Sequence, residues 1–254
     1  MIELTAADGH KFSAYRADPS DAPKGAVIVL QEAFGVNPHI CKIADEFAAK
    51  GYVAIAPALI ERATKDAEPG KDDAHDIDGR EFVKQVGTDG PFADLQATID
   101  AVKDAGKVAL VGYSGGGYLA YLSGSRVSGL ACAIGYYGHG IVDRYMEKSK
   151  IPTLVHFGDN DPVTPSEEVI QFRAYRPDVS VYTYPAGHGF SCDEGDSYDK
   201  EAAEKALERT LFWISQYVEG QPPILLKNAG AYAQAKTDKK KKKKPADDQG
   251  PPMD

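Results

Sequence analysis

A single serine lies among four glycines in the stretch VGYSGGGYLA, and its surroundings match the pattern Gly-x-Ser-x-Gly. An apolar run precedes this motif, and an apolar run with helical spacing follows it. A strand-to-helix turn of this kind, a nucleophile elbow, raises a serine hydroxyl above the carboxyl end of a sheet. Ser114 is therefore the candidate nucleophile, and the Gly115 backbone N–H is a candidate oxyanion donor. The alternative is a glycine-rich turn that only lets a strand and a helix pack together.

A serine hydroxyl is a weak nucleophile, so it needs a base, and the base needs an orienting acid. Behind a nucleophile elbow the expected chain order is Ser, then Asp or Glu, then His. Asp161 follows an apolar run in TLVHFGDNDP, and His188 stands between two glycines just after another predicted strand. The sequence thus predicts a triad of Ser114, Asp161 and His188. Asp159 competes with Asp161 for the acid, and Asp161 could instead be a turn or capping residue.

The remaining histidines have contexts of different kinds. His10, His39 and His75 lie in polar or helix-start segments and are predicted to be solvated. His156 lies inside a predicted strand and is predicted to belong to the core. His139 follows a strand at the same edge as the triad, where it could line a substrate pocket or simply be exposed.

Short β-rich runs alternate with longer segments of helical periodicity. The predicted strands are Lys11–Tyr15, Ala26–Gln31, Tyr52–Ala56, Lys107–Val111, Ala131–Tyr136, Thr153–Phe157 and Ser180–Tyr184. The predicted helices are Pro38–Lys50, Phe92–Ala105, Gly116–Ser123, Ser166–Tyr175 and Lys200–Val218. This alternation predicts an α/β fold with a mostly parallel central sheet and helices on both faces.

Composition divides the 254 residues into an acidic body and a basic end. Residues 221–254 carry eight lysines and four aspartates, including six consecutive lysines at 239–244, whereas the net charge of the whole chain is −9. We expect residues 1–220 to form the catalytic domain and residues 221–254 to form a disordered, solvated Lys-rich tail. Such a tail could instead contact anionic lipid or RNA, but the acidic body argues against nucleic acid as a main partner.

The cysteines, the N-terminal residues and the length of the apolar runs restrict the class of protein that the sequence can encode. Cys41, Cys132 and Cys192 are far apart and suggest neither a disulfide framework nor a zinc site. The N-terminal residues show no signal pattern, and no apolar run is long enough to span a membrane, so we expect a cytoplasmic protein without membrane contact. The polar segment 61–90 is predicted to be either a lid or a solvated excursion.

Several segments together resemble the dienelactone hydrolases, which are α/β-hydrolase-fold enzymes that open lactones and cleave esters. They are QEAFGVN at 31–37, the elbow GYSGGG, GYYG at 135–138, GDNDPV at 158–163 and AGHGF at 186–190. The resemblance covers about residues 1–218. It implies Ser114 as nucleophile, His188 as base and Asp161 as orienting acid, with an oxyanion hole formed by the backbone N–H groups of Ala33 and Gly115.

The chain departs from the best-known members of that family in two ways. Those members use a cysteine nucleophile, and the glutamate that matches Glu32 helps to generate its thiolate. With a serine nucleophile, we expect Glu32 to hold the hydroxyl or to shape the oxyanion loop, unless it is only a buried, paired carboxylate. The lactone-specific members also bind the substrate carboxylate with arginines. One of these positions is Cys192 here, and Arg62 or Arg80 could substitute.

The expected function is a serine hydrolase that cleaves small-molecule esters or lactones without a metal or an organic cofactor, as a monomer or a homodimer. The candidate pocket residues are Phe34, Tyr113, Tyr118, His139 and Arg80. A thioesterase or small-peptide hydrolase could use the same triad, because a fold does not fix a substrate. A non-catalytic binding module with this fold is the alternative from another class.

Overall fold

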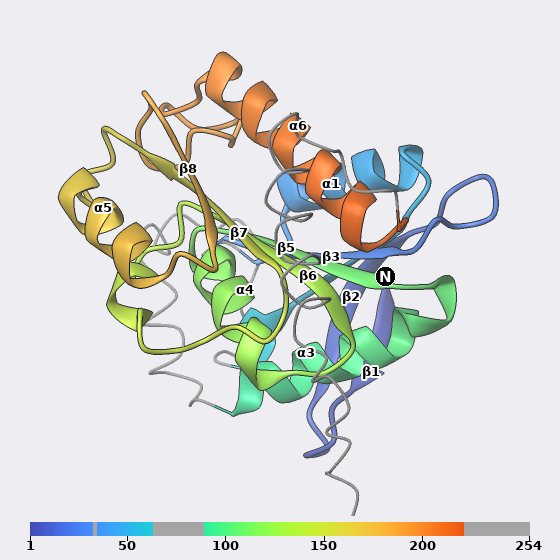
Figure 1. Ribbon diagram of the computed structural model, residues 1–254. Helices are drawn as coiled ribbons and strands as arrows, with labels where there is room; N and C mark the ends of the chain where they lie inside the picture. The colour runs from blue at the N-terminus through green and yellow to red at the C-terminus, as the bar shows by residue number, and fades with distance from the viewer. Residues whose placement is uncertain (33–34, 63–88, 221–254) are drawn as a thin grey trace, which may run out of the picture. The chain divides into compact units, whose positions relative to one another are not determined.

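An eight-stranded sheet lies at the centre of the computed structural model, which describes residues 1–32, 35–62 and 89–220 (Figure 1). The strands are β1 (Ile2–Thr5), β2 (Lys11–Ala17), β3 (Ala26–Leu30), β4 (Val53–Pro57), β5 (Val108–Tyr113), β6 (Leu130–Tyr136), β7 (Thr153–Gly158) and β8 (Ser180–Tyr184). Their order in the sheet is β1-β2-β4-β3-β5-β6-β7-β8. β1 and β4 each pair with β2 in antiparallel fashion, and all other pairs are parallel. The prediction of a mostly parallel sheet is confirmed.

The central strands are apolar along their whole length because both faces of the sheet are covered. In β3, all five residues are buried. Ala26, Ile28 and Leu30 enter the core on one face, and Val27 and Val29 enter the core on the other. A continuous apolar run thus divides between two cores, as the period of two in a strand requires.

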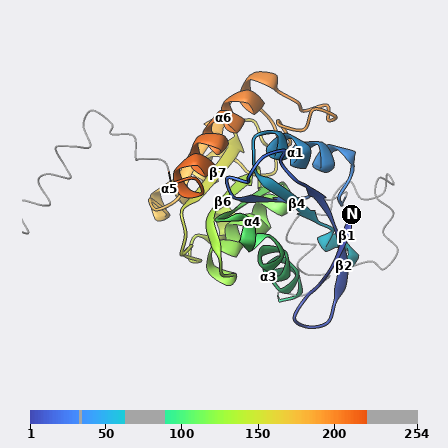
Figure 2. The same cartoon turned by 90° about the vertical axis from the view of Figure 1, so that its right-hand side faces the viewer.

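Helices cover both faces of this sheet (Figures 1 and 2). α1 (Pro38–Ala49) and α6 (Lys200–Tyr217) pack on one face. α3 (Gly90–Val102), α4 (Gly115–Arg126) and α5 (Ser166–Tyr175) pack on the other. Short 3₁₀ turns lie at η1 (Leu59–Arg62), η3 (Lys103–Ala105) and η4 (Val142–Arg144). The helices predicted on both faces are confirmed, and in each case the observed range overlaps the predicted one.

Two helix starts that matter for the site are fixed by capping side chains. Asn37 accepts a hydrogen bond from the backbone N–H of Ile40 at 3.0 Å, with Pro38 as the first residue of α1. Asp199 accepts one from Ala202 at 2.9 Å at the start of α6. These caps satisfy backbone donors that have no partner inside a helix.

The sequence analysis missed one strand. β1 has only four residues, and its side chains alternate between half-buried and exposed. It pairs only with β2, at the edge of the sheet. A short edge strand contains few apolar residues, so the pattern IELT does not by itself indicate a strand.

The described residues belong to one unit, Met1–Gly220. The expectations of a disordered tail at 221–254 and of a lid within 61–90 fall largely on residues outside those that the structure describes, and they stay predictions. None of the helices in the described ranges combines the length and the apolar character that crossing a membrane requires.

Candidate active site

The glycines around Ser114 allow a close approach of backbone segments. Ser114 has φ 49° and ψ −114°, a conformation that L-residues rarely adopt. A Cβ atom at Gly112 would overlap the carbonyl of Gly116, and one at Gly116 would lie 2.5 Å from the carbonyl oxygen of Gln31. The elbow predicted from the sequence is therefore present, and glycine is required there for space.

Ser114 occupies the N-cap position of α4, but its side chain makes no capping hydrogen bond. A serine at this position usually adopts an extended backbone and bonds the first turn of the helix. The left-handed backbone of Ser114 directs the hydroxyl elsewhere, and Oγ lies 3.2 Å from Nε2 of His188. Gly115 lies in the first turn of the helix, where backbone N–H groups have no partner within the helix.

The three residues of the predicted triad come together at the carboxyl edge of the sheet. Ser114 follows β5, Asp161 follows β7 and His188 follows β8, and these strands are parallel. Nδ1 of His188 lies 2.8 Å from Oδ2 of Asp161. The imidazole therefore connects the serine hydroxyl on one side to the carboxylate on the other.

The structure separates Asp161 from its competitor Asp159. The Asp161 side chain is fully buried, and its second oxygen accepts a hydrogen bond from the Val163 N–H at 2.8 Å. Asp159 is exposed, and its backbone carbonyl accepts a bond from Ser166. Of the two carboxylates, only Asp161 is placed to orient His188.

Glu32 follows β3 at the same edge. Its carboxylate accepts a hydrogen bond from the Tyr137 hydroxyl at 3.1 Å, and this hydroxyl also lies 2.9 Å from Oγ of Ser191. Burial raises the pKa of the Glu32 carboxyl. Three neighbours oppose this rise, namely His39, Tyr137 and His188. Among the described residues, the hydrogen bond of Glu32 is thus with Tyr137 and not with Ser114.

Tyr137 is a site residue that the sequence analysis did not identify. Its φ of 37° makes it, with Ser114, one of the two described non-glycine residues of positive φ. Its N–H bonds the His156 carbonyl at 2.7 Å, and its ring contacts the His188 ring edge-on with centroids 5.2 Å apart. The motif GYYG marked the segment, but nothing in it indicated a bond to Glu32.

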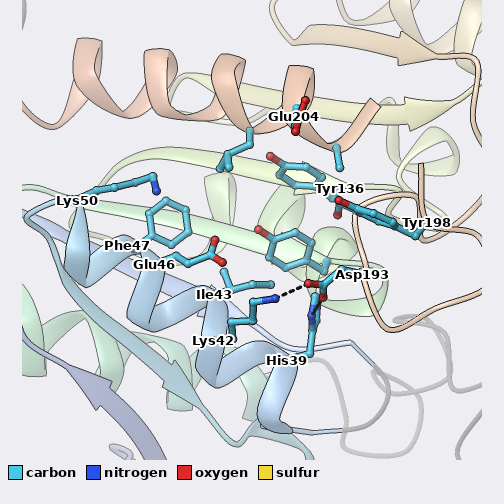
Figure 3. Close-up of a pocket in the computed structure, with 14 residues that line it drawn as sticks. His39, Lys42, Ile43, Glu46, Phe47, Lys50, Tyr136, Asp193, Tyr198 and Glu204 are labelled. Carbon is cyan, nitrogen blue, oxygen red and sulfur yellow. Dashed lines mark hydrogen bonds and ion pairs between the residues drawn. The ribbon is translucent and has the colours of Figure 1, made fainter. Parts of the chain in front are cut away.

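The predicted pocket residues have separate locations. Tyr113 and Ser191 are both among the residues that line a cavity of about 160 Å³ between α1 and α6. Figure 3 shows this cavity. Tyr118 is fully buried, and its hydroxyl accepts a hydrogen bond from Arg144 at 2.8 Å, so its place in the substrate pocket stays a prediction. His139 is half-buried.

Three predicted residues lie outside those that the structure describes, so their roles stay predictions. They are Ala33 of the oxyanion hole and the pocket residues Phe34 and Arg80.

The other histidines correct part of the sequence analysis. His39 is buried, although it was predicted to be solvated, and its Nδ1 lies 3.0 Å from Oδ1 of Asp193. His10 is half-buried rather than solvated, with Nδ1 3.1 Å from Asp94. His156 is buried in β7, as predicted.

The environment of Cys192 is acidic. Burial raises the pKa of this thiol, and the negative charges of Glu32, Glu194 and Asp193 contribute to the rise. Arg62, which was considered as a substitute cation, lies 2.8 Å from the Asp94 carboxylate and also binds Asp8. Arg62 is therefore already engaged in ion pairs.

The described residues contain no group of three or more His, Cys, Asp or Glu side chains arranged to hold a metal ion. The chemistry that these residues can perform is proton transfer from a hydroxyl to an imidazole and nucleophilic attack by the resulting oxygen.

A mostly parallel sheet covered on both faces, with Ser114 after β5, Asp161 after β7 and His188 after β8, defines the α/β-hydrolase fold. Solved structures agree. A presumed dienelactone hydrolase from Klebsiella pneumoniae subsp. pneumoniae MGH 78578 is 29% identical with a TM-score of 0.73, over 84% of this chain and 98% of that one. An esterase from Pyrococcus furiosus is 16% identical with a TM-score of 0.64, over 85% of this chain and 91% of that one, and shows the fold alone.

The chain belongs to the dienelactone hydrolase family, whose family model matches residues 12–218. A carboxymethylenebutenolidase from Pseudomonas sp. strain P51 is 30% identical over 83% of this chain and 92% of its own length. The carboxymethylenebutenolidase of Pseudomonas putida is 29% identical over 87% of this chain and 98% of its own length. The chain is accordingly a hydrolase, and the expected α/β-hydrolase fold is confirmed.

Proposed function

We propose that this protein hydrolyses carboxylic esters or lactones by acyl transfer through Ser114, with His188 as base and Asp161 as orienting acid. The observation that carries the proposal is the continuous path from Ser114 Oγ to His188 Nε2 at 3.2 Å and from His188 Nδ1 to Asp161 at 2.8 Å. The relatives named carboxymethylenebutenolidase support the substrate class.

The reaction proceeds in two steps. His188 takes the Ser114 proton while the oxygen attacks the carbonyl carbon, and the protonated imidazole then gives this proton to the leaving oxygen. Water attacks the acyl-enzyme with His188 again as base, which releases the acid and restores the serine. The Gly115 N–H supplies one oxyanion donor, and the N–H of Ala33, outside the described residues, is the expected second.

Glu32 acts beside this path, within electrostatic reach of His188. An ionised carboxylate there favours the imidazolium that forms in both steps, because opposite charges attract strongly in a partly buried site. Its hydrogen bond with Tyr137 holds it in place. Glu32 is thus proposed to support the base rather than to bind the nucleophile.

The acidic surroundings of Cys192 favour uncharged substrates. A substrate carboxylate near this thiol would meet the charges of Glu32, Glu194 and Asp193 instead of a bidentate arginine. We expect a higher kcat/KM for p-nitrophenyl acetate than for the anionic dienelactone. Cleavage of dienelactone near the diffusion limit, with poor cleavage of simple esters, would contradict this preference.

Labelling with a fluorophosphonate, followed by mass spectrometric mapping of the adduct, tests the proposed nucleophile. We expect one adduct per chain, on Ser114, and its loss in His188→Ala. His10→Ala is a matched control, because His10 also pairs with an aspartate, and it should label normally. A folded wild-type protein that forms no Ser114 adduct would refute the proposal.

A further inference from the structure

The cavity between α1 and α6 is separate from the catalytic triad (Figure 3). Among the described residues, its walls include none of Ser114, Asp161, His188 and Glu32. Its volume is about 160 Å³. An apolar cavity of about 150 Å³ is sufficient to bind benzene. The space between the two helices is therefore large enough for a molecule with a single ring.

Rings and aliphatic side chains make up much of the cavity wall. Ile43 and Phe47 line it from α1, and Leu207 lines it from α6. On the side of the sheet, the rings of Tyr113 and Tyr136 lie with their centroids 4.8 Å apart. Such a wall favours a ligand ring, because the ring leaves water and packs against other rings.

One wall residue, His39, has a buried nitrogen without a partner. Its side chain is 4% exposed, and its Nδ1 lies 3.0 Å from Oδ1 of Asp193. Its Nε2 is buried and has no hydrogen-bond partner among the described residues. In the buried His156, by contrast, the two nitrogens face the hydroxyls of Tyr184 and Thr210. Buried polar atoms are normally satisfied, so a polar group of a ligand in the cavity is the candidate partner of the His39 Nε2.

The chemistry of this nitrogen favours a hydroxyl as its partner. The Asp193 carboxylate only accepts, so Nδ1 of His39 carries a hydrogen. Nε2 then accepts a hydrogen bond if the ring is neutral and donates one if the ring is charged. A hydroxyl group both donates and accepts, so it can pair with Nε2 in either form.

The charges around the cavity favour an uncharged ligand. The wall includes three carboxylates and two ammonium groups, which belong to Glu46, Asp193, Glu204, Lys42 and Lys50. The Lys42 ammonium is already bound to the Asp193 carboxylate (Figure 3). A ligand anion would therefore meet a wall with an excess of negative charge. The rings and aliphatic side chains oppose the burial of a charge of either sign.

We propose that this cavity is a binding site for a small neutral phenol, whose ring packs between α1 and α6 and whose hydroxyl pairs with Nε2 of His39. The inference does not depend on the proposed function, because His39 takes no part in acyl transfer. Occupation of the site supplies a partner for the nitrogen that the described residues leave without one.

Titration of the protein with phenol, followed by proton–nitrogen-15 NMR, tests the site. We expect saturable shifts of backbone amide signals from α1 and α6, with a dissociation constant in the millimolar range. Benzene has the same ring but leaves Nε2 unpartnered, so it should bind about tenfold more weakly than phenol. Absence of a saturable shift with phenol would mean that the cavity holds water only and would overturn the inference.

His39→Asn isolates the contribution of Nε2. The asparagine amide retains a donor for Asp193 but has no atom in the place of Nε2. Phenol should bind this variant about tenfold more weakly than wild type, whereas the affinity for benzene should change little. His10→Asn is the matched control, because it alters a histidine–aspartate pair that does not line the cavity, and its affinity for phenol should match wild type. Equal affinities of wild type and His39→Asn for phenol would overturn the inference.

A variant that fills the cavity distinguishes this site from any other place where phenol could bind. Ala203 lines the cavity from α6 and is half-buried. The larger side chain in Ala203→Leu occupies part of the space, so the shifts caused by phenol should be lost, while circular dichroism and a thermal melt report whether the variant is folded. Binding of phenol to folded Ala203→Leu with the affinity of wild type would place the ligand elsewhere and overturn the inference. The same variant decides the question should His39→Asn fail to fold.

Discussion

Two histidine–aspartate pairs each have one member on the segment after β8, His188 in one and Asp193 in the other, and they are buried in opposite ways. In the pair His188–Asp161, the aspartate side chain is fully buried and the histidine is 28% exposed. In the pair His39–Asp193, the histidine is 4% exposed and the aspartate is 35% exposed. The Nδ1 to oxygen distances are nearly the same, 2.8 and 3.0 Å.

The length of the contact between Nδ1 and the carboxylate therefore does not show by itself which of the two histidines acts as a base. An exposed imidazole with a buried acid can exchange protons with a ligand, and its Nε2 lies beside the Ser114 hydroxyl. In the second pair the imidazole is buried beside a more exposed acid, and its Nε2 has no hydrogen-bond partner among the described residues. Burial and the partner of Nε2, rather than the length of the Nδ1 contact, distinguish the candidate base His188 from His39.

The same substitution in both pairs gives the largest contrast. Asp161→Asn should lower kcat about 10⁴-fold, because an asparagine leaves the imidazole in the wrong tautomer. Asp193→Asn should lower it only several-fold. Steady-state kinetics on p-nitrophenyl acetate measure both, and Asp159→Asn serves as the control, with activity close to wild type. Equal losses of kcat in Asp161→Asn and Asp193→Asn would show that the two histidine–aspartate pairs do not differ in their importance for catalysis.

A smaller effect is expected at Glu32, which lies at the same edge of the sheet as the triad and accepts a hydrogen bond from Tyr137. Glu32→Gln should lower kcat about tenfold without unfolding the protein, because it removes the charge that favours the imidazolium of His188. Kinetics and a thermal melt on the same sample measure turnover and folding. Unchanged turnover would remove Glu32 from the mechanism.

Tyr137→Phe tests the same carboxylate from its hydrogen-bond side. The hydroxyl of Tyr137 helps to lower the pKa of Glu32, so its loss should raise that pKa and reduce kcat/KM a few-fold in the acidic range. The measurement is the kcat/KM profile over pH, and a uniform loss at every pH would show that Tyr137 acts only through packing.

The last prediction concerns stability and not activity, at His156, which has hydroxyl partners in place of a carboxylate. Burial lowers its pKa from 6.5 to about 3. Between these values the unfolded chain binds a proton that the folded protein does not, so stability falls as the pH drops through this window. From pH 7 to pH 5 this costs about 2 kcal/mol in the free energy of unfolding. Urea melts of wild type and His156→Gln measure it, and an identical pH dependence in both would contradict the assignment.

The positions of Ser114, Asp161 and His188 could be predicted from the sequence because each stands within a few residues of the carboxyl end of a predicted strand. Parallel strands bring such residues to one edge. The order of Ser, Asp and His is also a known regularity of this fold. Local pattern and topology therefore sufficed for these three residues.

The contacts of His39 and Tyr137 could not be predicted in this way. The partner of His39 is 154 residues away in the chain, and that of Tyr137 is 105 residues away. The start of a helix normally faces solvent, so the local context of His39 indicated exposure. Only the packing of α1 against the segment after β8 reverses this, and no short motif encodes such packing.

The elbow is tied to its surroundings through the main chain. The Ser114 N–H bonds the Tyr136 carbonyl at 3.0 Å, and the Gly116 N–H bonds the Gln31 carbonyl at 3.1 Å. Bonds of this kind survive exchange of the neighbouring side chains, so the reactive hydroxyl keeps its place while the residues around it vary. For directed evolution, this means that libraries at the pocket positions can explore new substrates with little risk of displacing the nucleophile.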